Sequence, residues 1–308
     1  LLRDAEERDR DLGLGQRVDG ILLMLLAVGI FSIMDAIIKW VTAGYPTIQI
    51  VFFRSFFAFV PLSFFVFRRG GGLATRRTFG HVARAVIGLS SMVGFFYAFA
   101  YLPLATVVAI GFAAPIFITA LSVPLLGEAV GRRRWSAVVV GFLGVVIMVS
   151  PGADVFDPVS LVALVATVFY ALAAVQVRKL CRTESATAIV FYFSLACSLI
   201  SGLLLPIYWV TPSWGDLALL ISIGLLGGCA QIAMTNAYRR AEAALVASFD
   251  YTAIVWSVLL GYFIWDELPR ANVWFGVALV IASGAYILYR ETTLGLKRGA
   301  GRRLHSRR

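Results

Sequence analysis

Four charged side chains interrupt long apolar stretches of the sequence. They are Asp35 in FSIMDAIIKW, Arg54 in VFFRSFF, Arg84 in HVARAVIG and Asp250 in ASFDYTA. A charge at the centre of a membrane-spanning helix costs about 2.5–3.5 kcal/mol on the insertion scale, so we expect each to have a partner or a function. Asp35 and Arg54 lie at similar depth in their segments, as do Arg84 and Asp250. We therefore predict two charge-assisted pairs, acting as structural clamps or as gating, coupling and carboxylate-binding contacts.

A second group of side chains could line a binding pocket. The predicted pocket residues are Phe31, Ser91, Phe112, Tyr170, Gln231 and Tyr251. Phe31 and Tyr170 hold corresponding positions in the two halves of the chain, as do Phe112 and Tyr251, and their rings could enclose an apolar or aromatic group. An amide or hydroxyl in hydrocarbon requires a hydrogen-bond partner, which a bound molecule could supply. Packing within a helix bundle is the alternative for each aromatic residue.

Patterns for catalysis and metal binding are scarce. The chain has two histidines and three cysteines, and no cysteine belongs to a CxxC pair. It contains no HExxH, no GxSxG and no glycine-rich loop followed by Lys-Ser or Lys-Thr, the patterns that supply a metal site, a nucleophile or a phosphate cradle. The sequence therefore argues against a membrane enzyme, and it indicates no metal and no cofactor.

Composition defines the elements that must hold these residues. Of the 308 residues, 60% are hydrophobic and 14% are charged, whereas a soluble domain carries about 25% charged residues. Apolar runs of about twenty residues, the length of helix that spans a bilayer, recur along the chain. We predict an all-α membrane protein, with the lipid bilayer and a small molecule as its partners. Its net charge of +10 is explained by topology, so we expect no nucleic-acid partner.

Ten apolar segments are predicted to span the membrane. They are residues 20–42, 47–67, 79–102, 104–126, 134–150, 159–180, 186–209, 215–238, 243–264 and 272–290. The loops after even-numbered segments are rich in Arg and Lys, and those after odd-numbered segments have almost none. Because basic loops mark the cytoplasmic side, we expect both termini in the cytoplasm. The sequence does not indicate an oligomeric state.

The second half of the chain aligns with the first without a gap when 139 (267 minus 128) is added to each residue number. We call this constant offset the repeat shift. Under the repeat shift Glu128 coincides with Glu267, and Trp135 with Trp274, at the ends of the fourth and ninth segments. Each half holds five segments, so the second enters the membrane from the opposite side. Inverted-topology repeats are typical of secondary transporters, in which two halves move around a central site. For the repeated glutamate we expect a local role, at the positive end of the following helix dipole.

The repeat also predicts the domain organisation. We expect a charged cytoplasmic tail at 1–19, a first five-helix repeat at 20–150, a second, inverted five-helix repeat at 151–290 and a basic cytoplasmic tail at 291–308. The first stretch has mixed charges and no apolar core, so it does not read as a cleavable signal peptide. Pro115, within the fourth segment, removes one helical hydrogen bond and should bend that segment.

The chain resembles the drug/metabolite transporter superfamily, and within it the EamA-type permeases. The resemblance rests on the ten segments, on their division into halves of five, and on the Gly-Glu and Asp-Glu motifs that close segments four and nine. The resemblance covers residues 20–290. It implies a ten-helix basket with a central cavity, in a bacterial inner membrane, and substrates such as amino acids, S-adenosylmethionine, riboflavin or nucleotide sugars.

From these features we expect a secondary transporter, and more specifically an exporter of amino acids, including aromatic ones, that works by alternating access. Uptake or exchange of another metabolite, such as S-adenosylmethionine or riboflavin, is the first alternative. A gated channel for small solutes is an alternative of another class, because polar lining residues would serve it too.

Overall fold

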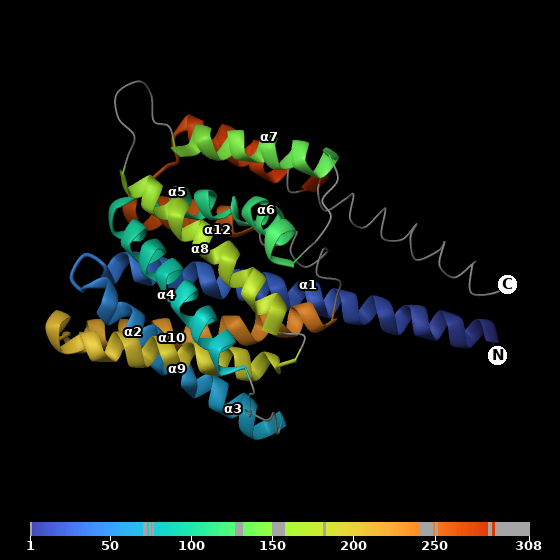
Figure 1. The fold of residues 1–308 in the computed structure, drawn as a ribbon, viewed down its shortest axis with the longest axis horizontal. Coiled ribbons are helices and arrows are strands. Elements are labelled where there is room, and N and C mark those ends of the chain that lie inside the picture. Colours follow the sequence, from blue (N-terminus) through green and yellow to red (C-terminus); the bar gives the residue numbers. More distant parts are fainter. Residues whose placement is uncertain are drawn as a thin grey trace.

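The structure is a computed structural model that describes residues 2–69, 73, 75, 77–126, 132–149, 158–180, 183–240, 249, 252–282 and 285–286. The regular structure in these ranges is entirely helical, as the sequence predicts. The labelled helices (Figure 1) are α1 (Leu2–Val41), α2 (Thr47–Phe57), α3 (Phe59–Arg69), α4 (Thr78–Tyr101), α5 (Leu104–Gly111), α6 (Ala114–Leu126), α7 (Arg132–Val149), α8 (Pro158–Leu180), α9 (Ala186–Tyr208), α10 (Trp214–Arg240) and α12 (Ala253–Trp265). An apolar helix at Ala271–Ala282 follows them.

Six helices of the described part are long and apolar enough to cross a membrane. They cover Val18–Val41, Thr47–Phe64, Thr78–Tyr101, Pro158–Val177, Thr187–Tyr208 and Trp214–Met234. Shorter apolar helices lie at Leu104–Ile118, Ala253–Trp265 and Ala271–Ala282. Each predicted segment thus contains helix, but ten complete crossings and the location of the termini stay predictions.

Two of the predicted segments are broken in the middle. The second is divided into α2 and α3 at Ala58, three residues before Pro61, and the fourth into α5 and α6 at Phe112, three residues before Pro115. A proline lacks the N–H that would bond to the carbonyl four residues earlier. The bend expected at Pro115 is therefore found, together with a second break near Pro61 that the prediction did not include.

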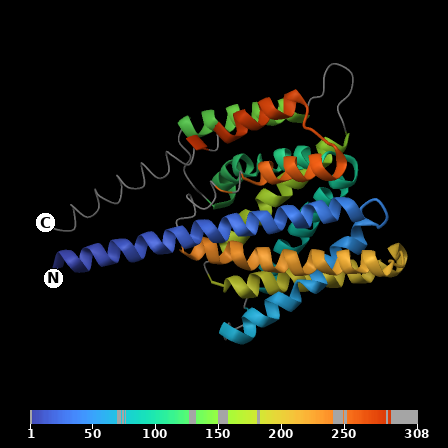
Figure 2. The same cartoon turned by 180° about the vertical axis from the view of Figure 1, so that it is seen from behind.

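The helices pack as the repeat requires. The most extensive packing joins α1 to α10 and α4 to α8, and the repeat shift converts the first pair into the second. Figures 1 and 2 show α1 beside α10, and α7 beside the helix at Ala271–Ala282. Small residues permit the close approaches: a Cβ on Gly94 would lie 2.8 Å from the Cβ of Ala166, and one on Gly144 would lie 2.9 Å from the carbonyl oxygen of Gly276. Such contacts supply the van der Waals attraction that holds helices together in lipid.

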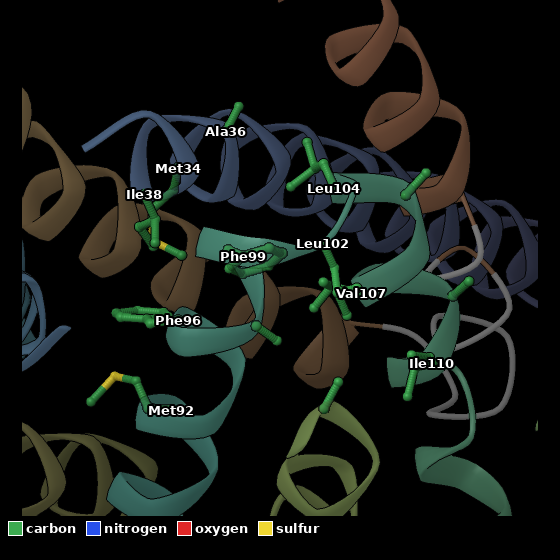
Figure 3. Close-up of a cluster of buried hydrophobic side chains, with 14 of the residues drawn as sticks. Met34, Ala36, Ile38, Met92, Phe96, Phe99, Leu102, Leu104, Val107 and Ile110 are labelled. Carbon is green, nitrogen blue, oxygen red and sulfur yellow. The ribbon is translucent and has the colours of Figure 1, made fainter. Parts of the chain in front are cut away.

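The largest apolar cluster extends through most of the bundle, and one part of it lies where α1, α4 and α5 meet. Figure 3 shows Met34 and Ile38 of α1 facing Phe96 and Phe99 of α4, with Leu104 at the start of α5 nearby. These side chains are almost fully buried. The cluster fixes α1 against α4, so the residues of α1 that line the candidate site have a rigid support.

Hydrogen bonds gather the loops at one end of the bundle, here called the Lys39 end. The hydroxyl of Tyr45, in the loop between α1 and α2, donates to Asp216 at the start of α10 (2.8 Å), which raises the pKa of Tyr45 above its usual range. The side chain of Gln49 exchanges two hydrogen bonds with the backbone of Val210, at 2.8 and 2.9 Å. The α1–α2 and α9–α10 loops therefore lie together.

A second set of contacts gathers loops at the opposite end, here called the His81 end. The hydroxyl of Tyr192 in α9 donates to the carbonyl of Leu73 (2.8 Å). The His81 ring at the start of α4 lies 3.6 Å from Glu184, in the turn between α8 and α9, and both side chains are buried. The described loops thus separate into two sets, as expected for a chain that runs back and forth between two surfaces.

Candidate functional site

Lys39 joins the two repeats at the Lys39 end. Its ammonium donates to the backbone carbonyl of Leu102 (2.7 Å) and to Oε1 of Glu267 (3.0 Å), and it lies 5.3 Å from the ring centre of Trp265. Leu102 ends α4, in the same repeat as Lys39, whereas Glu267 follows α12 in the other. The ion pair therefore fastens α1 to the end of α12.

The backbone after α12 aims Glu267 at this position. Asp266 is in the left-handed region (φ 55°); its N–H donates to the carbonyl of Tyr262, and the N–H of Glu267 donates to the carbonyl of Gly261. A residue in the left-handed conformation whose N–H bonds to the carbonyl four residues earlier ends a helix and reverses the chain. Among the described residues, Oε1 of Glu267 accepts from Lys39 and Oε2 accepts no hydrogen bond, so hydrogen bonds between the Glu267 carboxylate and the start of the next helix are not found. Glu128, its counterpart, lies outside the described residues.

A cavity of about 110 Å³ reaches Asp35, one turn of α1 before Lys39. Its lining residues are Val28, Phe31, Ser32, Asp35, Leu104, Val108, Ala253 and Ser257. They belong to α1, α5 and α12, so both repeats contribute. Two of the predicted site residues, Phe31 and Asp35, are therefore brought together here. Ligand pockets usually measure about 300–1,000 Å³, so in this state the cavity is too small for a complete metabolite.

The predicted pairing of Asp35 with Arg54 is not found. Among the described residues, the ion pairs within 4.0 Å are Lys39–Glu267 and His81–Glu184. The two charges interact only at longer range. Arg54 instead faces α10, with its Nε 3.7 Å from the position of a Cβ on Gly227. Equal depth in two helices does not give equal rotation about their axes, which the prediction did not take into account.

Arg84 is held against α9. Its guanidinium carbon lies 4.3 Å from the ring centre of Phe193, which is a cation–π contact. The charge of Arg84 also interacts with that of Arg54 and with the side chains of Cys197 and Tyr170. Asp250, its predicted partner, lies outside the described residues, so that pairing stays a prediction.

The other predicted pocket residues do not line the cavity that contains Phe31. Ser91 is buried, and its hydroxyl donates to the carbonyl of Ala166 in α8 (2.9 Å), which indicates a packing role in this state. Phe112 is buried at the end of α5, where its N–H completes the helix. Tyr170 is half exposed and Gln231 is partly buried on α10. Tyr251 lies outside the described residues.

Sequence reasoning missed Ser257, Phe193 and the pairing of Lys39 with Glu267. One signal was present: the repeat shift that superposes Glu128 on Glu267 also superposes Lys39 on Arg178, another cation. An acid and a cation that recur at the same repeat positions suggest that they pair. Ser257 and Phe193 carried no such signal, because a single serine or phenylalanine is common in spanning helices.

Comparison with known proteins gives one family and several relatives. Residues 18–150 and 158–289 each match the EamA-like transporter family. The S-adenosylmethionine uptake transporter of Rickettsia prowazekii is 30% identical over 275 residues, 89% of this chain and 94% of the relative. The pseudopaline exporter CntI of Pseudomonas aeruginosa is 33% identical over 274 residues, 85% of this chain and 94% of the relative.

A more distant relative and a solved structure extend this result. The riboflavin transporter of Vibrio cholerae is 29% identical over 281 residues, 89% of this chain and 94% of that protein. A protein crystal structure with 20% sequence identity superposes with a TM-score of 0.62, covering 86% of this chain and 95% of the other. At that identity the likeness concerns the fold alone.

Proposed function

The chain belongs to the EamA-like transporter family, and from that premise we propose that it carries an amino acid or an amino-acid-derived metabolite by alternating access. The coarser description follows from the family and its relatives: the protein is a small-metabolite transporter rather than an enzyme, and it passes the inner membrane several times. Aromatic amino acids and S-adenosylmethionine are the first candidate substrates, and export is the proposed direction.

The observation that carries this proposal is the cavity lined by Phe31 and Asp35. A carboxylate beside an aromatic ring suits a cationic group attached to an apolar body. An amino acid offers an ammonium group, and S-adenosylmethionine offers a sulfonium group as well. Relatives named for S-adenosylmethionine uptake and for pseudopaline export support a metabolite of this size, and they name both directions of transport.

Alternating access assigns a role to the Lys39–Glu267 contact. In this state it joins the two repeats one turn of α1 away from a cavity that is too small for a substrate. Separation of Lys39 from Glu267 would let α12 move away from α1 and enlarge the cavity toward the Lys39 end. The proposal therefore makes this ion pair one of the closures of the transport cycle.

The proposed topology has ten crossings in two inverted repeats, with both termini in the cytoplasm. It is supported by the repeat, by the basic loops and by the separation of the described loops into two sets. Cysteines at Gly44, where nothing lies within 4 Å of an added Cβ, and at the exposed Thr183 test it. An impermeant maleimide should label only Gly44→Cys in intact cells, and labelling of Thr183→Cys from outside contradicts the topology.

The substrate is tested by flux in proteoliposomes with labelled S-adenosylmethionine and labelled L-phenylalanine. Saturable uptake that is stimulated by the same compound inside the vesicles indicates a carrier, whereas unsaturable flux indicates a channel. Asp35→Asn should lower the apparent affinity about 10- to 100-fold, as expected from the loss of one charge-assisted contact. Asp19→Asn, an exposed position on the same helix, is the control, and unchanged affinity in Asp35→Asn contradicts the proposed cation site.

A further inference from the structure

The interior of the bundle between α2, α4 and α9 contains polar atoms without partners. Among the described residues, Nε of Arg54, Nε and Nη1 of Arg84, and the hydroxyls of Ser55 and Ser198 are buried and accept or donate no hydrogen bond. A buried polar group costs free energy unless it is hydrogen-bonded, and a buried charge costs more. These atoms are therefore available to form hydrogen bonds with a bound molecule.

The two arginines are held in position by repeat-related contacts. A Cβ on Gly88 would overlap Nη1 of Arg84 and lie 2.8 Å from the Phe193 ring, and a Cβ on Gly227 would lie 3.7 Å from Nε of Arg54. The repeat shift carries Gly88 onto Gly227, and Arg54 onto Phe193. In the first repeat Arg54 therefore packs against Gly227, and in the second repeat Phe193 packs against Gly88. Because glycine has no side chain, a guanidinium group fits beside each of them.

Within the part of the chain that the structure describes, the charges of this group do not balance in this state. Arg54 and Arg84 are close enough for their charges to interact, and both act on Cys197 of α9, which lies one helical turn beyond Phe193. Asp35 is not within ion-pair distance of either arginine. Two cations that repel each other in a membrane interior form a strong site for an anion, and planar guanidinium groups match a carboxylate in shape and hydrogen bonding.

We propose that Arg54 and Arg84 together bind the carboxylate of the transported substrate. This inference rests on the proposed function, because an amino-acid-class substrate carries both an ammonium group and a carboxylate. The Asp35 cavity receives the cationic part, and the two arginines receive the anionic part. The substrate is then held between α1, α2 and α4 of one repeat and α9 and α12 of the other.

Matched pairs of compounds test the proposal on the purified full-length protein. S-adenosylmethionine is compared with decarboxylated S-adenosylmethionine, and L-phenylalanine with phenethylamine, so each pair differs only in the carboxylate. Riboflavin, which has no carboxylate, is the fifth compound. The readouts are the shift of the melting temperature with ligand concentration and competition for flux in proteoliposomes.

The wild type should bind each carboxylate about 10- to 100-fold more tightly than its amine, the range expected for a charge-assisted contact. Arg54→Gln and Arg84→Gln should bring this ratio close to one, and Arg54→Lys should restore part of it. Arg270→Gln, which removes an exposed cation, should leave it unchanged. Because neither buried cation has an ion-pair partner among the described residues, the glutamine variants should melt without ligand no lower than the wild type.

Three results would overturn the inference. An amine that binds as tightly as its carboxylate removes the anion site but leaves the amino-acid class intact. Binding of riboflavin alone, or of none of the five compounds, removes the proposed substrate class and the anion site together. A glutamine variant that melts several degrees lower without ligand indicates a structural pair, and rescue of Arg84→Asp by Asp250→Arg would identify Asp250 as the partner of Arg84.

Discussion

The ion pair between Lys39 and Glu267 gives a measurable prediction about access to the cavity. Glu267→Ala removes the ion pair between the repeats, but leaves Lys39 its hydrogen bond to Leu102 in the same repeat and its contact with the Trp265 ring. The exposed fractions of the two side chains are 9% and 28%, so the pair is better shielded than a surface ion pair, which contributes about 0–1 kcal/mol. A hydrogen bond to a charged group contributes about 1.5–3 kcal/mol.

Because Glu267 is partly exposed, we take about 1–2 kcal/mol for the contact, which lies between those two ranges. If the pair is made only when the Lys39 end is closed, its loss should raise the fraction of open protein about 5- to 30-fold. Ser257→Cys, at a cavity position that is 1% exposed, reports this fraction in a background without the native cysteines. Its maleimide labelling rate should rise by the same factor in Glu267→Ala.

Three comparisons make this prediction refutable. Arg270→Ala, in the same loop, should not change the labelling rate, and Gly44→Cys, where nothing lies within 4 Å of an added Cβ, should be labelled equally fast in every variant. Lys39→Met should speed labelling at least as much as Glu267→Ala, because it also loses the contact with the Trp265 ring. In Glu267→Ala it should add less than in the wild-type background, because the ion pair is already lost. Equal labelling of Ser257→Cys with and without Glu267, or additive effects of the two substitutions, would refute the role of the pair as a closure.

Three further predictions concern stability and packing. Gly228→Leu should destabilise the protein by about 1–3 kcal/mol or more, because a Cβ there overlaps Pro61; thermal unfolding should show this loss, and Gly44→Leu should be neutral. Ser91→Ala should lower the melting temperature slightly, in line with the loss of about 1 kcal/mol from one buried hydrogen bond, and leave substrate affinity unchanged; a large change in affinity would return Ser91 to the binding site. The bond to Asp216 raises the pKa of Tyr45 above 10.0, so the folded chain holds this proton more tightly than the unfolded one: the stability it contributes is present below pH 10 and is lost as the pH rises further. Tyr45→Phe should remove that part of the alkaline loss in melting curves, and an identical pH profile in the variant would contradict the assignment.

The sequence was sufficient for the features that depend on local pattern. Apolar runs predicted the helices, and the repeat shift predicted two related halves, with which the equivalent α1–α10 and α4–α8 packing agrees. Proline at position 115 predicted the break between α5 and α6, because the effect of a missing N–H is confined to one turn. Phe31 was predicted as a pocket residue and Asp35 as a gating or coupling residue, and the structure places both in the lining of one cavity.

The side-chain pairings could not be obtained in the same way. Lys39 and Glu267 are separated by 228 residues, and their meeting depends on the turn at Asp266. Arg54 was assigned to Asp35 from depth alone, whereas the space beside Gly227 draws it toward α10. A pattern along the chain gives the face and the depth of a residue, but the neighbour it meets is decided by the packing of other helices.

The break between α2 and α3 has no counterpart in α9, which runs unbroken from Ala186 to Tyr208 although it occupies the same place in the second repeat. The carbonyl of Phe57 cannot receive the usual bond from residue 61, since that residue is a proline. Bending the chain at this point breaks few backbone hydrogen bonds, because one is already missing. Bending α9 at the equivalent point would break hydrogen bonds that are intact. We therefore expect the first repeat to deform and the second to rotate as a stiffer body, so that opening toward one side of the membrane and opening toward the other are not mirror images and proceed at different rates.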